Sequence, residues 1–298
     1  MENIWIFAAI LAVAFYAVSN IFDKILRDRY VKSTYGLTIL FLIKNVVFLI
    51  FLPFIDLHSL TPIYFGLIIA AGIFWLFTVI TYVHALSMEE VSRVVPIWNI
   101  YPIFTLLLSA IFLQEQLTVL DYAAFSLLLM GGIVLSIHDL KNIRLSTAFW
   151  LMVASAASFS IYAIILKYLL TRMDFWNVFV LISISGGAIG MLLLIFEKPR
   201  KEAIEGLHGL KHGGLIPFIC GGLVGYAGVL LYNFSVHGGK VSIVASLDGF
   251  QSLFLFIFIA ILSAFFPNIF REEITKEIII TKLIALGLMC TGLFLLYS

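Results

Sequence analysis

The chain has 298 residues, of which 62% are hydrophobic and only 12% are charged, and its mean hydropathy is +1.12. Soluble domains carry roughly 25% charged residues, so this composition excludes an ordinary water-soluble globular protein. The net charge of +1 indicates no particular partner, and nothing in the composition suggests a nucleic acid. The apolar residues fall in runs of about 20, the length that crosses roughly 30 Å of hydrocarbon as a helix. We therefore expect a multi-pass membrane protein.

Ten apolar spans follow one another along the chain. Each is predicted to be a helix, because lipid offers the backbone no hydrogen-bond partners and the runs are too long for the strands of a barrel. The first span is expected to remain in the mature protein, since Met-Glu-Asn is not a basic signal-peptide start. Asp174 is expected to cap the seventh span, and the polar segment 197–213 is expected to be a solvated loop. The predicted spans are residues 4–24, 35–54, 62–86, 90–113, 119–137, 147–169, 176–196, 214–236, 241–265 and 278–297.

An internal repeat organises the chain. The first copy closes on Glu115 to Thr118 and the second on Glu272 to Thr275. Because each copy has an odd number of spans, the second copy must cross the bilayer upside down relative to the first. We predict an all-α membrane protein with ten transmembrane helices, arranged as two inverted five-helix repeats, residues 1–145 and 146–298, around a central cavity. At a shift of 150 residues, Val91, Ser92, Val94, Phe104, Ala110 and Ile111 recur as Val241, Ser242, Val244, Phe254, Ala260 and Ile261.

The basic residues are divided unevenly between the two sides of the predicted membrane. Of 18 Lys and Arg residues, 14 fall on one side, three (Lys167, Arg172 and Lys240) fall on the other, and Lys44 lies within a span. Loops rich in Lys and Arg remain cytoplasmic. Both termini are therefore expected outside the cell, and the segment 197–213 inside.

Lys44 is the most informative polar residue, because it lies about ten residues from either end of the second span. Reaching an interface from there would need ~14 Å, which a lysine side chain cannot cover. A lysine at that depth costs ~2.5–3.5 kcal/mol, so a group in the protein or in a substrate should neutralise it. Asp248, seven residues into the ninth span, is the expected protein partner. A structural ion pair and a substrate-binding role both remain open.

Four pairs of corresponding spans carry polar and aromatic stripes on otherwise apolar helices. On the first span, Tyr16, Ser19, Asn20 and Asp23 are spaced i, i+3, i+4 and i+7, which places them on one helix face. Any one of these groups could simply join two helices, but four paired stripes together indicate a polar, aromatic-lined cavity. The candidate substrate-binding residues are Lys44, Tyr16, Ser19, Asn20, Trp75, Tyr82, Trp98, Tyr101, Phe159, Tyr162, Tyr232, Asp248 and Gln251.

Other positions are expected to serve packing. Leu128 of the fifth span and Leu286 of the tenth are expected to face lipid. The eighth span carries a small-residue face, which allows either tight static packing or movement of this half of the protein. That face is formed by Gly221, Gly222, Gly225 and Gly228.

No catalytic or metal-binding motif is found in the sequence. It has no His-Glu-x-x-His, no Gly-x-Ser-x-Gly and no phosphate-binding loop, and Cys220 and Cys290 both lie in apolar runs. His208 and His212 are better explained as solvated side chains of the polar loop than as metal ligands. We therefore expect no enzyme activity, no cofactor and no bound metal.

The sequence resembles the drug/metabolite transporter superfamily, of the EamA type. The resemblance covers the whole chain and rests on the two five-span repeats, on Pro96 and Pro102, on the closing Glu-x-Leu-Thr at Glu115 with its repeat at Glu272, and on a basic residue, Lys44, where such proteins often have arginine. It implies a ten-helix basket with a central cavity that moves small metabolites, amino acids or drugs by alternating access. Members of this type usually have both termini inside, opposite to the charge bias here. Related four-span exchangers use a glutamate in the first span, where this chain has Ala14, Phe15 and Tyr16, so proton-driven cation efflux by that route is not expected.

The function favoured by these features is a secondary transporter for a small polar or amphipathic metabolite in the plasma membrane. Lys44 favours a substrate with a carboxylate, an amino acid above all. A flippase or transporter for a phosphorylated lipid carrier, or for a sugar or nucleotide metabolite, is the alternative. An intramembrane enzyme lacks a catalytic cluster, and a non-transporting scaffold leaves the polar stripes unexplained. The expected partners are the substrate and the lipid bilayer, and a homodimer is left open.

Overall fold

The computed structural model describes residues 3–58, 60–88, 97–140, 146–265 and 276–297, and within them the regular elements are helices. This agrees with the apolar runs, whose backbone groups must bond within each segment. The elements are α1 (Ile4–Arg29), α2 (Thr34–Ile43), η1 (Lys44–Phe54), α3 (Pro62–Met88), α5 (Tyr101–Leu108), η2 (Ser109–Leu113), α6 (Val119–Leu140), α7 (Thr147–Leu170), α8 (Phe175–Met191), η3 (Leu192–Ile195), α9 (Glu197–Gly209), η4 (Leu210–Gly214), α10 (Leu215–Gly238), α11 (Val241–Leu247), α12 (Gly249–Phe265) and α13 (Lys276–Tyr297).

Among these residues, eight helices are long and apolar enough to cross a membrane. Two shorter apolar helices, Tyr101–Leu113 and Val119–Leu135, lie within the predicted fourth and fifth spans. The beginning of that fourth span, with Pro96, lies outside the described residues. The predicted all-helical, multi-pass membrane protein is therefore confirmed, while ten crossings stay a prediction.

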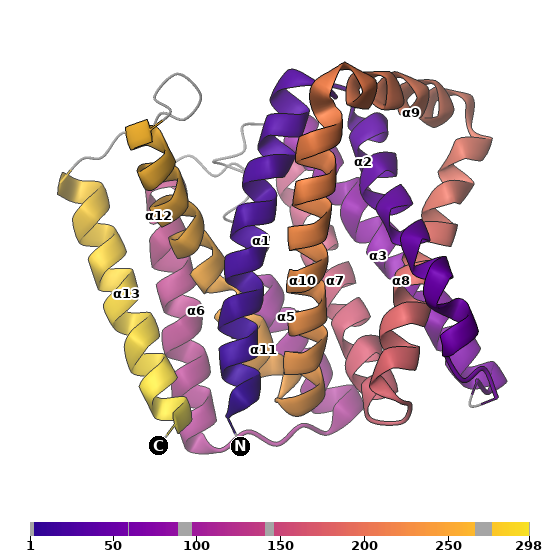
Figure 1. Cartoon of the computed structure of the whole chain (residues 1–298). Helices are drawn as coiled ribbons and strands as arrows, with labels where there is room; N and C mark the ends of the chain where they lie inside the picture. The colour runs from indigo at the N-terminus through magenta and orange to yellow at the C-terminus, as the bar shows by residue number, and fades with distance from the viewer. Residues whose placement is uncertain (1–2, 59, 89–96, 141–145, 266–275, 298) are drawn as a thin grey trace.

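Helices from the two halves of the chain are interleaved. The helix α1 packs along α10, α3 contacts α7 and α8, and α6 pairs with α13 (Figure 1). The helix α5 contacts α7 and α11, so it also packs against the other half of the chain. The interior of the bundle is consequently built from faces that lie far apart in the sequence.

The two ends of the bundle differ. Both termini lie at one end, and α9 lies across the opposite end (Figure 1). The prediction of a solvated loop at 197–213 is wrong over Glu197–Gly209, which forms α9. Pro199, Ala203 and Gly206 recur at helical spacing and are buried, and α9 packs on α2. The high polarity of the segment concealed this narrow stripe of small residues with a helical period.

The predicted second span is helical throughout, but its geometry changes at Lys44. The segment is α-helical as far as Ile43 and continues from Lys44 to Phe54 as a 3₁₀ helix. Stretches of 3₁₀ helix this long are uncommon and often mark a hinge or a strained sequence. The lysine therefore stands at the joint between two kinds of helix.

Leu128 shows where hydropathy misled the sequence analysis. It was expected to face lipid, but its side chain is fully buried between α6 and α13. A Cβ added to Gly292 of α13 would lie only 2.9 Å from Leu128 Cγ. Side chains that do face outward include Met130 on α6 and Leu283 on α13, which are 52% and 61% exposed. Lipid and a protein core are equally apolar, so composition alone does not separate the two environments.

The small-residue face of α10 lies against α1. Ser19 of α1 donates a hydrogen bond to the carbonyl oxygen of Gly221 at 3.0 Å. A Cβ added to Gly225 would lie 3.0 Å from Ser19 Oγ, and one added to Gly228 would lie 2.8 Å from the ring of Tyr16. Glycine is required at Gly228 because the Tyr16 ring occupies the space that a Cβ would fill.

Replacing Gly228 with alanine should therefore destabilise the protein by about 1–3 kcal/mol, the usual cost of overpacking a tight contact. Gly66→Ala is the matched control, because a Cβ at Gly66 would meet nothing within 4 Å. There the higher helix propensity of alanine should leave the melting temperature unchanged or raise it slightly. Equal melting temperatures for the two variants in detergent would contradict the close approach of α1 and α10.

Candidate functional site

Seven of the predicted site residues form one continuous group of rings, which we call the aromatic cluster. Phe159 of α7 lies at its centre, with ring-centre distances of 5.1 Å to Tyr101, 5.3 Å to Trp98 and 6.3 Å to Tyr232. Such separations fall in the favourable range for tilted and edge-to-face rings. The helices α3 and α7, the segment that enters α5, and α10 supply the cluster. Its members are Trp75, Tyr82, Trp98, Tyr101, Phe159, Tyr162 and Tyr232.

Asp248 lies beside the aromatic cluster, at the short break between α11 and α12. Its carboxylate interacts electrostatically with Tyr16, Tyr101 and Tyr232. The hydroxyl of Tyr101 donates a hydrogen bond to the carbonyl oxygen of Ala245 at 3.0 Å. By contrast, Asp248 Oδ1 and the Tyr232 hydroxyl are buried without a hydrogen-bond partner in the described structure. Buried polar atoms are usually paired, so two unpaired groups in one place indicate a site for a ligand.

Lys44 has a different acidic neighbour from the one expected. Its electrostatic partner is Asp23 of α1, not Asp248. The Nζ atom lies 4.7 Å from the ring centre of Phe41 and 5.8 Å from that of Phe218. Phe41 precedes the lysine by about one turn, and Phe218 lies in the first turn of α10, so both rings are closer to the α9 end. Helical side chains lean toward the helix N-terminus, so the lysine extends toward that end instead of remaining at mid-depth.

The lysine and Asp248 lie at different levels along α10. Gly222 faces the lysine, because a Cβ there would lie 3.3 Å from Lys44 Cδ. Gly228, six residues further along, faces Tyr16, which is a neighbour of Asp248. Six residues correspond to about 9 Å of helix. Lys44 with its neighbour Asp23, and the group around Asp248, are therefore two sites and not one.

Tyr82 links these two levels. It interacts electrostatically with Asp23 and Arg27 of α1, and its ring centre lies 6.0 Å from that of Trp98. The aromatic cluster thus extends from the Asp248 level toward the lysine pair. Packed aromatic rings therefore connect the two levels inside the bundle.

The three remaining predicted site residues are less closely connected to the cluster. Ser19 is buried and joins α1 to α10 through its bond to Gly221. Asn20 is exposed, and Gln251 is half-buried. The backbone nitrogen of Gln251 donates to the carbonyl oxygen of Asp248 at 2.9 Å, which holds the turn at the α11–α12 break.

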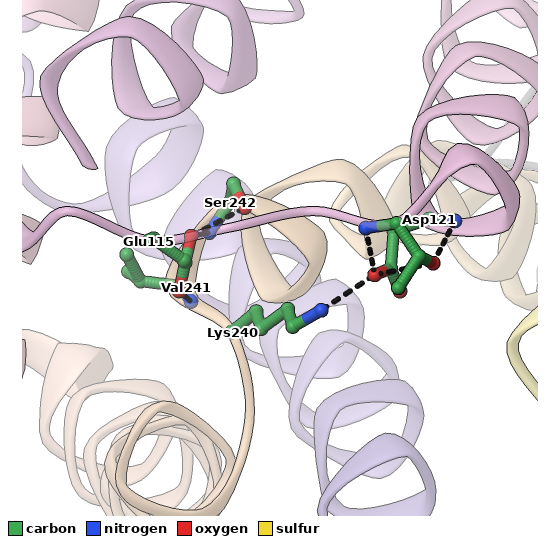
Figure 2. Close-up of polar contacts among 6 residues, drawn as sticks. Glu115, Asp121, Lys240, Val241 and Ser242 are labelled. Carbon is green, nitrogen blue, oxygen red and sulfur yellow. Dashed lines mark hydrogen bonds and ion pairs between the residues drawn. The ribbon is translucent and has the colours of Figure 1, made fainter. Parts of the chain in front are cut away.

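A contact between the two halves of the chain lies at the end where the termini are. Glu115, in the loop before α6, accepts hydrogen bonds from the backbone nitrogens of Val241 at 2.8 Å and Ser242 at 3.3 Å (Figure 2). It also accepts one from the Ser242 hydroxyl at 2.5 Å. These residues begin α11, so the carboxylate caps the positive end of that helix. We call this interaction the Glu115 cap.

Two basic residues form further polar contacts beside the Glu115 cap. Lys240 pairs with Asp121 at 2.5 Å (Figure 2). Lys167 of α7 donates hydrogen bonds to the carbonyl oxygens of Val236 and Gly239 at 2.7 Å each, where α10 ends. A cation at the end of one helix and an anion at the start of the next both complement the helix dipoles. A cavity of about 680 Å³ beside these contacts is lined in part by Glu115, Asp121, Lys167, Arg172 and Lys240.

Glu115 and Asp23 are not among the site residues predicted from the sequence, although the sequence carries a signal for each. Glu115 belongs to the recurring Glu-x-Leu-Thr motif, and the Val-Ser pair that it caps also recurs in the repeat. Its counterpart Glu272 lies outside the described residues. Asp23 stands on the same helix face as Tyr16. In the described part of the chain, no group of three His, Cys, Asp or Glu residues is placed to hold a metal ion.

Three comparisons with known proteins bear on identity. A solved structure described as "Crystal structure of protein" aligns with a TM-score of 0.69 at 14% sequence identity, over 99% of this chain and 96% of that one. At this identity the likeness shows the fold alone. The comparison with curated proteins found no match. A family model described as the EamA-like transporter family matches residues 3–137. Residues 3–137 are therefore similar to the EamA-like transporter family, which is part of the drug/metabolite transporter superfamily.

Proposed function

We propose that this protein is a secondary transporter that moves a small polar or amphipathic metabolite by alternating access. The match of residues 3–137 to a transporter family supports a membrane transporter and not an enzyme. The observation that carries the finer proposal is the aromatic cluster with Asp248, to which helices of both halves contribute. In transporters built from repeats, a site between the halves becomes open to each side in turn as one half moves against the other.

We further propose ten transmembrane helices in two inverted five-helix repeats around a central cavity that holds this site. In the expected repeat, α1 corresponds to α7 and α3 corresponds to α10. Replacing each helix by its counterpart turns the contact α1–α10 into the contact α7–α3, which is also observed. The helices α6 and α13 are each other's counterparts, so their contact is unchanged by the replacement. A two-fold relation between the repeats would produce both kinds of pairing.

The Glu115 cap supports a mechanism with two end states. A carboxylate from the first half satisfies the first donors of a helix in the second half. Opening this end would separate the carboxylate from donors that then need water. We propose that the end carrying the termini is closed in this state, and that the cap breaks when it opens.

Lys44 and its neighbour Asp23 bear on the substrate class. Lys44 favours a carboxylate, and an amino acid is the first class that fits it. Asp23 weakens that support, because a lysine whose charge is partly offset by a carboxylate of the protein does not require an anion from the substrate. We therefore propose a small polar or amphipathic metabolite, amino acids included, without requiring a carboxylate.

A ligand screen tests the proposal. Amino acids, amines, nucleosides, sugars and phosphorylated metabolites would be added to the purified protein, and the melting temperature measured, because a ligand of the folded state raises it. Trp98→Ala should abolish the shift given by any active compound, whereas Leu283→Ala, which changes an outward-facing side chain, should retain it. A shift that survives Trp98→Ala would place the ligand outside the aromatic cluster.

The charge bias also predicts the orientation in the plasma membrane, with the termini outside and α9 in the cytoplasm. Single cysteines at Thr171 and Glu205, both exposed and at opposite ends, would replace Cys220 and Cys290 as the only thiols. An impermeant maleimide should label Thr171→Cys in intact cells, and Glu205→Cys only after permeabilisation. The reverse pattern would show that both termini face the cytoplasm.

A further inference from the structure

Asp248 is a buried carboxylate with no cation to neutralise it in the described structure. Its interactions are with tyrosines, and Lys44, the cation inside the second span, interacts electrostatically with Asp23 instead. The two levels are about 9 Å apart along α10, so Lys44 is not the partner of Asp248. An ionisable residue within a membrane helix is expensive and usually marks a functional site.

Two buried oxygen atoms around Asp248 have no hydrogen-bond partner in the described structure, while the Tyr101 hydroxyl lies within hydrogen-bonding reach of the carboxylate. Asp248 Oδ1 and the Tyr232 hydroxyl are both buried and unpartnered, and Tyr232 as a whole is only 4% exposed. The remaining groups around them are aromatic rings of the cluster, notably Tyr101 and Phe159. A carboxylate, a hydroxyl oxygen and several ring faces together complement a group that carries positive charge and several N–H donors.

We propose that Asp248, Tyr232 and the aromatic cluster bind the ammonium group of the substrate, so that the substrate is a small amine. This inference rests on the proposed function and narrows its substrate class. The ammonium group donates to Asp248 Oδ1 and to the Tyr232 hydroxyl oxygen, while ring faces cover its remaining sides. A carboxylate on the substrate is not needed at this site, and its negative charge would be repelled by Asp248.

Three probes with the same phenyl group separate this inference from simple apolar binding. Phenethylamine carries an ammonium group, 2-phenylethanol is neutral, and 3-phenylpropionate is an anion. The melting temperature of the full-length protein in detergent would be followed against the concentration of each compound, which gives an apparent Kd. Phenethylamine should bind, and the other two compounds should bind at least about thirtyfold more weakly, the loss expected when a buried charge loses its partner.

Two variants assign the effect to named atoms. Asp248→Asn should weaken phenethylamine binding at least about thirtyfold. Asp174→Asn is the matched control, since Asp174 caps α8 far from the cluster and asparagine caps a helix equally well. If Asp248→Asn does not fold, Tyr232→Phe tests the amine site instead. The Tyr232 hydroxyl has no hydrogen-bond partner in the described structure, so its removal breaks no bond, and the ring remains. That variant should fold normally and bind phenethylamine about tenfold more weakly, the loss of one hydrogen bond to a charged group.

Equal binding of the three probes, no shift with phenethylamine, or unchanged affinity in Asp248→Asn and Tyr232→Phe would each overturn the amine site. These outcomes leave the transporter proposal standing, because a transporter for neutral metabolites would still give uptake into vesicles. Conversely, phenethylamine could bind in a manner that depends on Asp248 while no compound is transported. That result would support the amine site and contradict the transporter proposal.

Discussion

Replacing Lys44 with methionine should lower the melting temperature of the purified protein, and adding Asp23→Asn should largely restore it. The single change leaves the Asp23 carboxylate without its cation inside the bundle. Breaking a fully buried ion pair costs about 3–5 kcal/mol. Both side chains are only half-buried here and interact electrostatically rather than through a salt bridge in the described structure, so we expect a smaller loss, about 1 kcal/mol, for each single variant.

The double variants identify the partner. Lys44→Met with Asp23→Asn removes both charges and should recover most of the lost stability, whereas Lys44→Met with Asp248→Asn should not. Recovery with Asp248→Asn instead would show that the pairing inferred from the structure is wrong. Single variants as stable as the natural protein would show that the lysine reaches water and needs no partner.

The second large effect is expected at the Glu115 cap. Glu115→Gln removes the charge that complements the start of α11 and leaves one oxygen to serve three donors. The loss should be about 1–3 kcal/mol, since hydrogen bonds to a charged group and the helix dipole both contribute. Glu197→Gln is the matched control, because Glu197 forms an exposed pair with Lys201 and should change stability by less than about 0.5 kcal/mol.

The same variant reports on opening of the closed end. A cysteine at Ser246, which is buried on α11, should react faster with an impermeant thiol reagent when Glu115→Gln is present. The reason is that the cap joins the two halves at this end, and weakening it favours the open state. A labelling rate unchanged from the Ser246→Cys single variant would mean that the cap is structural and does not control access.

Local signals in the sequence predicted local structure well. Asp174 was predicted to cap α8, and its side chain accepts hydrogen bonds from the backbone nitrogens of Trp176 and Asn177 at 2.9 and 3.3 Å. The apolar runs predicted the helices because a membrane segment has few other ways to satisfy its backbone. The polar and aromatic stripes likewise named residues that the fold brings together around Phe159.

Lateral neighbours could not be predicted in this way. Depth along each helix suggested that Lys44 and Asp248 could meet, but it carries no information on which helices touch. The predicted depth of the lysine is that of its backbone, whereas its side chain extends toward the α9 end and Asp23. Leu128 and α9 were misjudged for a related reason, because burial against protein depends on partners that the local sequence does not name.

Counterflow into proteoliposomes tests the central claim, transport of a small amine by alternating access, most directly. Vesicles containing the protein would be loaded with unlabelled phenethylamine and amine-bearing metabolites, then diluted into trace amounts of the same compounds carrying a label. A carrier that alternates between two sides should accumulate label transiently above its equilibrium level, and Asp248→Asn should abolish the overshoot. Labelled uptake no greater than in protein-free vesicles, for every compound tested, would contradict the account.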